Sequence, residues 1–135
     1  MGKRTGTITS LNQSMPYAAV IGLENVEDEA GLLSVLRYKP SNIGNTQIPA
    51  LHGGVVGAFL EHAAILHLLH AGEGDAFPKI VNISIDYLRP CRAADTFARG
   101  TLVKQGRRIA NVRVEAWQDD PAKPVAAAHV HLLMP

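Results

Sequence analysis

The segment from Leu51 to His70 limits the possible folds of this chain more than any other. Apart from Glu61 and its histidines, it consists of glycine and apolar residues and leaves no continuous polar face. A helix that is apolar on nearly all sides has to be surrounded by protein. Most of the remaining sequence has the alternation of strands, so we expect one long helix enclosed by one curved sheet.

Length and charge describe an ordinary globular chain. A length of 135 residues fits one core, and we expect residues 1–16 to be an N-terminal arm or short helix and residues 17–135 to be one domain. Thirteen basic and twelve acidic residues leave a net charge of +1. A nearly neutral chain gives no electrostatic reason to expect nucleic acid or an anionic membrane surface as a partner.

Three features predict a cytoplasmic protein. The apolar segment is interrupted by Glu61, His62 and His67, which makes it too polar and too short to span a bilayer. Residues 1–15 lack the apolar core of a secretory signal. The single cysteine, Cys91, cannot form an intrachain disulfide, which agrees with a reducing compartment.

Period-two alternation predicts the strands around the helix. The predicted strands are residues 17–26, 32–39, 81–87, 96–105, 108–117 and 125–134. Residues 40–49, rich in Pro, Gly and Asn, are predicted to be a loop. The residues predicted to face the helix from the last two strands are small or β-branched, apart from one leucine: Ala110, Val112, Val114, Ala116, Ala126, Ala128, Val130 and Leu132.

The start of the predicted helix has features of an anion site. His52 is followed by Gly53 and Gly54, and glycines leave the N–H groups of a helix N-terminus unobstructed. Such groups can hold the oxyanion that forms when an ester or thioester carbonyl is attacked. Glu61 lies about 12 Å further along the helix axis, which suggests that the donor and this carboxylate meet across a symmetric dimer. Alternatively, the glycines only make a tight turn and Glu61 pairs with a lysine or arginine.

These motifs together resemble a known family. His52-Gly53-Gly54 with Glu61 nine residues after the histidine, the strand Ile85-Asp-Tyr-Leu-Arg-Pro90 and the hairpin Val103-Lys-Gln-Gly-Arg-Arg108 are similar to hot-dog fold acyl-CoA thioesterases of the PaaI and 4-hydroxybenzoyl-CoA type. The resemblance covers about residues 17–134. It implies an α+β hot-dog fold, in which five or six antiparallel strands wrap one long helix.

The resemblance also implies roles for site residues. In that family the acid on the helix is the nucleophile or general base, a role that falls on Glu61. The backbone N–H after the histidine polarises the thioester carbonyl, which assigns Gly53 as oxyanion donor, with His52 and Gly54 completing the motif.

A third catalytic group is less well defined. The family tends to place Asn or Gln about six residues before the histidine, where this chain has Thr46 between Asn45 and Gln47. We favour Asn45. Other members carry Ser or Thr on the strand after the helix, where this chain offers Asn82 and Ser84 as candidate substrate-binding residues.

Basic residues gather at predicted strand ends and at the hairpin tip. Arg89, Arg107 and Arg108, with Arg92 and Lys104 nearby, are candidates for contacts to the phosphates of CoA. The alternative is an ordinary solvated surface.

No cofactor is expected, because thioester hydrolysis needs a base or nucleophile and one stabilised negative charge. The pairs His67/His70 and His129/His131 have feasible spacings for a metal but lack a third ligand nearby in the sequence, so we predict no metal site.

The predicted function is hydrolysis of an acyl-CoA thioester to a free carboxylic acid and CoA. The predicted assembly is a homodimer or homotetramer with active sites at the subunit interface. Two alternatives stay open: a module that binds acyl-CoA or fatty-acyl groups without turnover, and a hot-dog dehydratase or hydratase. The nine-residue spacing argues against the last. Aromatic and medium-chain acyl groups both stay open as substrates.

Overall fold

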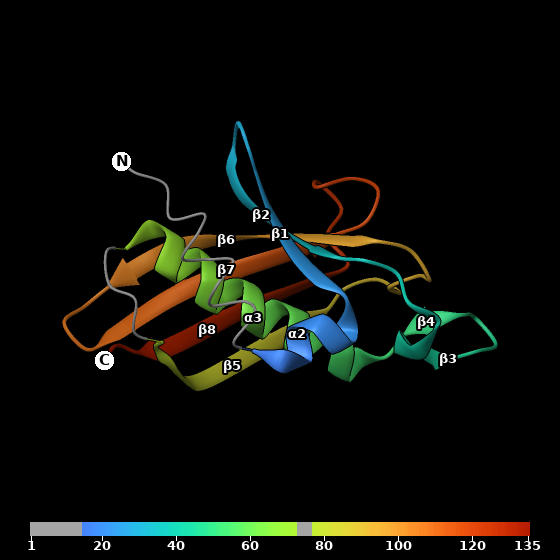
Figure 1. The fold of residues 1–135 in the computed structure, drawn as a ribbon, viewed down its shortest axis with the longest axis horizontal. Helices are drawn as coiled ribbons and strands as arrows, with labels where there is room; N and C mark the ends of the chain where they lie inside the picture. The colour runs from blue at the N-terminus through green and yellow to red at the C-terminus, as the bar shows by residue number, and fades with distance from the viewer. Residues whose placement is uncertain (1–14, 73–76) are drawn as a thin grey trace.

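One long helix lies across one face of an antiparallel sheet in the computed structural model, which describes residues 15–72 and 77–135 (Figure 1). The helix is α3 (Gly53–Ala71). The strands lie in the order β1 (Leu23–Asp28), β2 (Gly31–Leu36), β6 (Thr96–Gln105), β7 (Ile109–Trp117), β8 (Ala126–Leu133) and β5 (Lys79–Tyr87). The predicted helix, the antiparallel sheet and its number of strands are confirmed.

The three strands at the C-terminal end of the chain match their predicted bounds within a residue or two. β7 pairs with both β6 and β8, and Val114 lies between Gly100 and Ala128. The side chains predicted to face the helix are buried on β7 and β8. Period-two alternation was sufficient to predict the bounds and inward faces of these strands because each has one face on the core and one outside it.

Small residues allow α3 to lie close to the sheet. Ala98, Ala110 and Ala128 are almost fully buried beneath the helix. At Gly100 on β6, a Cβ would lie 2.9 Å from the Cβ of His67 on α3. His67 cannot easily yield, because its Nδ1 lies 2.7 Å from the Ala63 carbonyl oxygen and its Nε2 lies 2.9 Å from the Leu32 carbonyl oxygen.

The expectation that the apolar segment is too short and too polar to span a bilayer is wrong by length and composition. Gly53–Ala71 has 19 residues and a mean hydropathy of 1.3, which suffices for a span on those two criteria. More than half of this helix is buried inside the fold. Packing against the sheet therefore accounts for its apolar composition.

The predicted strand at residues 17–26 is partly wrong. Its first part forms helix α2 (Pro16–Ile21), and only the second part forms a strand, β1. Proline at the first helical position and a left-handed Gly22, with φ of 83°, delimit this helix. The following pairing of β1 with β2 confirms the predicted antiparallel partner, although β2 ends at Leu36 instead of continuing to residue 39.

The predicted loop at residues 40–49 contains regular structure. It begins with a 3-10 turn, η1 (Pro40–Asn42), followed by the paired strands β3 (Ile43–Asn45) and β4 (Ala50–Leu51). This hairpin leads directly into α3. Its position at the right of Figure 1 marks the N-terminal end of the helix.

The edge strand β5 departs from simple alternation at one point. The pairing with β8 shifts between Ile80 and Asn82, which leaves Val81 58% exposed. Ile80, Ile83 and Ile85 pack against the core, so the inner face of β5 includes Ile80 and not Val81, which period-two alternation with Ile83 and Ile85 would place there. Within the described residues, β5 pairs only with β8, so its other edge carries unpaired backbone groups.

Candidate active site

The first turn of α3 contains one unused backbone donor. The Gly54 N–H donates to Nδ1 of His52, the N-cap residue, over 2.8 Å. The Val55 and Val56 N–H groups both donate to the His52 carbonyl oxygen. Among the described residues the Gly53 N–H has no acceptor. Gly53 therefore supplies the free N–H at the positive end of the helix dipole.

A tyrosine from β5 contacts the same turn. The Tyr87 hydroxyl donates to the Gly53 carbonyl oxygen over 2.9 Å, and a Cβ at Gly53 would lie 3.7 Å from the tyrosine ring. One turn further along α3, a Cβ at Gly57 would lie 3.2 Å from the Ile85 side chain. The start of α3 therefore runs alongside the end of β5.

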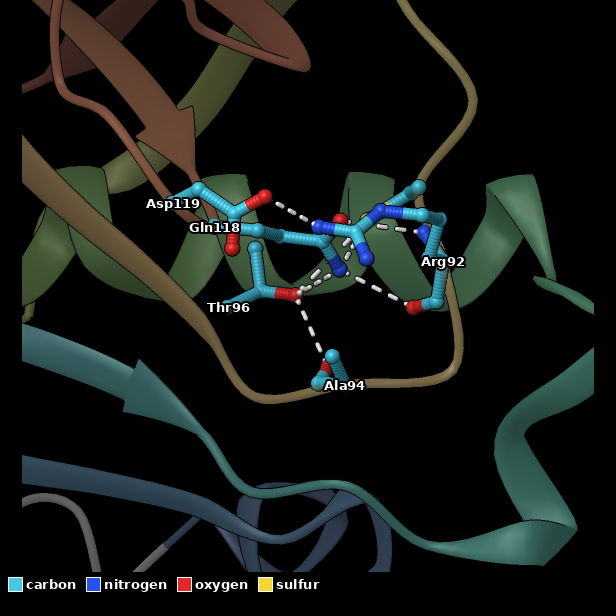
Figure 2. Close-up of polar contacts among 6 residues, drawn as sticks. Arg92, Ala94, Thr96, Gln118 and Asp119 are labelled. Carbon is cyan, nitrogen blue, oxygen red and sulfur yellow. Dashed lines mark hydrogen bonds and ion pairs between the residues drawn. The ribbon is translucent and has the colours of Figure 1, made fainter.

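The loop between β5 and β6 supports the segment that precedes the helix. The Leu51 N–H donates to the Cys91 carbonyl oxygen over 2.8 Å. Figure 2 shows how the Gln118 side chain holds this loop: it accepts from the Arg92 N–H and donates to the Arg92 carbonyl and the Thr96 hydroxyl. Arg92 also forms an ion pair with Asp119.

Cys91 does not have the properties of a nucleophile. Burial raises the pKa of its thiol, an effect that outweighs the Thr96 hydroxyl and the Arg92 charge. A thiol with a raised pKa stays protonated at neutral pH.

The hairpin β3–β4 brings Asn45 into the neighbourhood of His52 without joining it to the site. The two chain segments touch at Gly44, where a Cβ would lie 2.7 Å from the His52 Cα. The Asn45 side chain is exposed, and its Oδ1 accepts from the Gln47 N–H over 2.9 Å. Thr46 is also exposed in this turn. The role proposed for Asn45 stays a prediction.

Glu61 is half-buried on the helix and lies apart from the Gly53 donor. Eight residues separate them, about 12 Å along the axis. The Glu61 side chain has no hydrogen bond or ion pair with any described residue. The alternative in which a lysine or arginine neutralises Glu61 is therefore not seen in the described part of the chain.

The residue after Glu61 is a buried histidine. His62 is 9% exposed, and its Nδ1 has no hydrogen-bond partner among the described residues. Burial lowers the pKa of this imidazole. His62 is consequently a neutral polar group within the apolar helix.

The predicted substrate-binding residues are distributed over both ends and the outer face of the chain. Asn82 and Ser84 alternate with the inward Ile83 and Ile85, so they lie on the sheet face opposite α3. Arg89 follows Tyr87 closely and donates to the Pro124 carbonyl oxygen.

The other two arginines lie at the opposite end of the sheet. Arg107 and Arg108 are exposed at the β6–β7 hairpin tip, beside a surface groove that Leu133 and Met134 also line. Within one chain, therefore, the structure brings together His52, Gly53 and Gly54, but leaves Glu61 and these arginines apart from them.

The histidine pairs have other partners. His70 Nε2 lies 3.1 Å from a carboxylate oxygen of Glu27, and His129 Nε2 lies 3.2 Å from the Arg113 guanidinium. Within residues 15–72 and 77–135, no group of three or more His, Cys, Asp or Glu side chains has a geometry that could hold a metal ion.

Comparisons with known proteins identify the family of this chain. The family model described as the thioesterase superfamily matches residues 49–125, more than half of the chain. A curated relative, the medium/long-chain acyl-CoA thioesterase YigI of Escherichia coli, is 26% identical over 88% of this chain and 86% of its own length.

Solved structures extend the likeness to the whole fold. A protein from Chromobacterium violaceum is 41% identical, covers 97% of this chain and 91% of its own, and superposes with a TM-score of 0.78. A mutant form of the phenylacetic acid degradation protein PaaI of Thermus thermophilus is 22% identical over 89% of this chain and 99% of its own, with a TM-score of 0.73. The architecture is thus the hot-dog fold.

Proposed function

Because the chain belongs to the thioesterase superfamily, we propose that it hydrolyses an acyl-CoA thioester to a free carboxylic acid and CoA. In this proposal Glu61 is the general base or nucleophile and the Gly53 N–H is the oxyanion donor. His52 holds the neighbouring Gly54 N–H, and no cofactor takes part.

The observation that carries the proposal is that the two glycine N–H groups at the helix N-terminus differ: one is hydrogen-bonded and the other is free among the described residues. The ring of His52 occupies the Gly54 N–H, while the Gly53 N–H has no acceptor within the described residues. A preorganised donor that requires no rearrangement stabilises a developing oxyanion more effectively than water does. The carboxylate of Glu61, which has no partner among residues 15–72 and 77–135, would supply the base or nucleophile that the reaction also requires.

The chemistry follows two possible routes from these groups. In one, Glu61 takes a proton from water while the water oxygen attacks the thioester carbonyl carbon. In the other, the carboxylate attacks first and water then hydrolyses the mixed anhydride. In both, the carbonyl oxygen becomes an oxyanion at the Gly53 N–H and the C–S bond then breaks. In the first route the departing sulfur of CoA receives the proton that Glu61 took from water. In the second route CoA leaves as a thiolate, and hydrolysis of the anhydride by water releases the carboxylic acid, restores the Glu61 carboxylate and supplies the proton that the thiolate takes up.

The separation of about 12 Å along the helix argues that one chain does not assemble the site alone, because a base and an oxyanion donor must both reach one carbonyl group. We place the two groups on different chains of a homodimer. The unpaired edge of β5 is the natural contact, since a second copy of β5 would satisfy its backbone groups.

The contacts of α3 with β5 support one position for the two-fold axis of the proposed dimer. Gly53 lies level with Tyr87, and Gly57 lies level with Ile85. For Gly53 of one chain to face Glu61 of the other, the axis must pass midway between these two helical positions. That point is Gly57, so the β5 strands would pair antiparallel about Ile85.

The same axis would bring basic residues of one chain toward the site of the other. Lys79 and Leu133 pair at the end of the sheet that carries Arg108, while Tyr87 pairs with Ala126 at the other end. The axis therefore turns the Arg107–Arg108 end of one chain toward the Gly53 end of its copy, where Arg89 also lies. This supports a contact of these arginines with the phosphates of CoA.

The name of the relative YigI, a medium/long-chain acyl-CoA thioesterase, favours medium or long acyl chains. We propose these substrates ahead of aromatic acyl groups. A cytoplasmic location and a tetramer stay predictions.

The test is the release of free CoA thiol from a panel of acyl-CoAs by the wild type and by Glu61→Gln. The amide is nearly isosteric but cannot act as a base, so turnover should fall about a hundredfold or more. Glu29→Gln, which alters an exposed glutamate in the β1–β2 turn, is the matched control and should retain wild-type turnover. Equal turnover of all three proteins would remove Glu61 from the mechanism. Binding of acyl-CoA without turnover by the wild type would instead establish a binding module.

A further inference from the structure

We propose that Tyr87 is a positioning residue for the oxyanion donor: its hydroxyl holds the Gly53 carbonyl and thereby fixes the direction of the Gly53 N–H. The inference rests on the proposed function for its catalytic consequence. Its structural part, the restraint of Gly53, stands on the contacts of the described residues alone.

Two consecutive glycines at a helix start leave the donor poorly restrained. Glycine has the greatest backbone freedom of any residue, and the first turn of a helix lacks the hydrogen bonds that hold later turns. An N–H donor with that freedom would have to be ordered again in every catalytic cycle. The catalytic value of such a donor depends on its being fixed before the substrate arrives.

Each glycine is held by a different aromatic ring. Gly54 is held through its N–H by His52, whose Nδ1 would lie only 3.0 Å from a Cβ on that glycine. Gly53 is held through its carbonyl by the Tyr87 hydroxyl, with the tyrosine ring packed beside it. Because the Gly53 N–H itself must stay free for substrate, a restraint on its carbonyl is a way to fix this residue without occupying the donor.

The backbone of Tyr87 is held by the sheet, which fixes one partner of the contact with Gly53. It is the last residue of β5, and it pairs with Ala126 of β8 while the preceding residue pairs with Ala127. The side chain is 57% exposed in the single chain, so its burial contributes little to the core and its hydroxyl contact is separable from fold stability.

The kinetic test uses Tyr87→Phe, which removes only the hydroxyl. We expect kcat to fall about three- to tenfold, the effect of losing one neutral hydrogen bond, while KM changes by less than about twofold. Tyr38→Phe is the matched control: Tyr38 is also exposed, and its contact with Asp95 uses the backbone N–H and not the hydroxyl. An unchanged kcat in Tyr87→Phe would overturn the proposal. So would a lower kcat that comes with a lower melting temperature, because the loss would then reflect general destabilisation.

A second measurement decides the matter without reference to activity. In ¹⁵N relaxation of the wild type and Tyr87→Phe, the order parameter of Gly53 should drop from about 0.85 toward about 0.6 in the variant. Gly54, held by His52, should keep its wild-type value. An unchanged order parameter at Gly53 would refute the restraint even if the protein proves to be an active thioesterase. Conversely, a wild type that hydrolyses no thioester would refute the proposed function. The order parameter of Gly53 would still test the restraint by Tyr87.

Discussion

The two glycines that open α3 differ in what their N–H groups can do. Gly54 gives its N–H to His52, and Gly53 keeps its N–H free among the described residues. Gly53 is also the first helical residue, a position that proline favours because its missing N–H is not needed there. His52, with φ of −63° and ψ of 131°, already has the backbone conformation of a residue before proline.

This geometry permits a substitution that deletes the donor alone. Gly53→Pro should keep the fold and lower kcat/KM for acyl-CoA by about a hundredfold or more, because the oxyanion loses its hydrogen bond. Gly53→Ala retains the N–H and has room for its Cβ, so it should keep kcat/KM within a few-fold of the wild type. Steady-state kinetics of the pair provides the check. Similar activity of the two variants would exclude the Gly53 N–H as the donor.

His62 predicts how the free energy of unfolding depends on pH. Burial lowers the pKa of this imidazole in the folded chain, so near pH 6 the unfolded state binds more protons than the folded state. The folded chain is therefore at full stability above about pH 6.5 and loses stability as pH falls from there. In urea unfolding at about pH 7.5 and about pH 5.5, His62→Leu should reduce the loss by about 1 kcal/mol. An identical loss of stability in both proteins would show that the pKa of His62 does not differ between the folded and unfolded states.

Elements with a regular repeat were predictable, and short elements were not. α3 and the strands β6, β7 and β8 have alternating or uniform burial over many residues, so their positions follow from the sequence. The helix α2 and the hairpin β3–β4 are too short to show a period, and contacts distant in sequence fix them. Asn42, for example, donates its side-chain amide to the Ile21 carbonyl.

The close approach of α3 to β6 gives a prediction about stability. Replacing Gly with Ala at a compatible site usually stabilises a protein slightly, because it reduces the freedom of the unfolded chain. At Gly100 the new Cβ would meet His67 at 2.9 Å, so Gly100→Ala should instead destabilise the fold by about 1–3 kcal/mol. Chemical denaturation compares it with Gly53→Ala, where the nearest atom is 3.7 Å away. A stability equal to that of the wild type would mean that the helix can shift without cost.

Across the whole molecule, groups of the candidate site that lie in one local motif are predictable from the sequence, and groups brought together by distant segments are not. The motif around His52 and Glu61 predicts donor and carboxylate, because each needs only local sequence. Tyr87 belongs to the alternating inner face of β5, and no local signal shows that its hydroxyl reaches Gly53. The spacing of Gly53 and Glu61 suggests that the two groups meet across a dimer, but the position of the two-fold axis does not follow from the sequence and is part of the proposal.

In the proposed dimer, one thioester is held between the Gly53 N–H of one chain and Glu61 of the other. Mixing Gly53→Pro with Glu61→Gln under conditions that exchange subunits, and measuring the release of CoA, tests this arrangement. A mixed dimer would then contain one site with both groups intact. A one-to-one mixture should recover about a quarter of wild-type activity, because half of the dimers are mixed and each has one working site. A mixture that exchanges subunits but stays as inactive as its two parents would contradict the account.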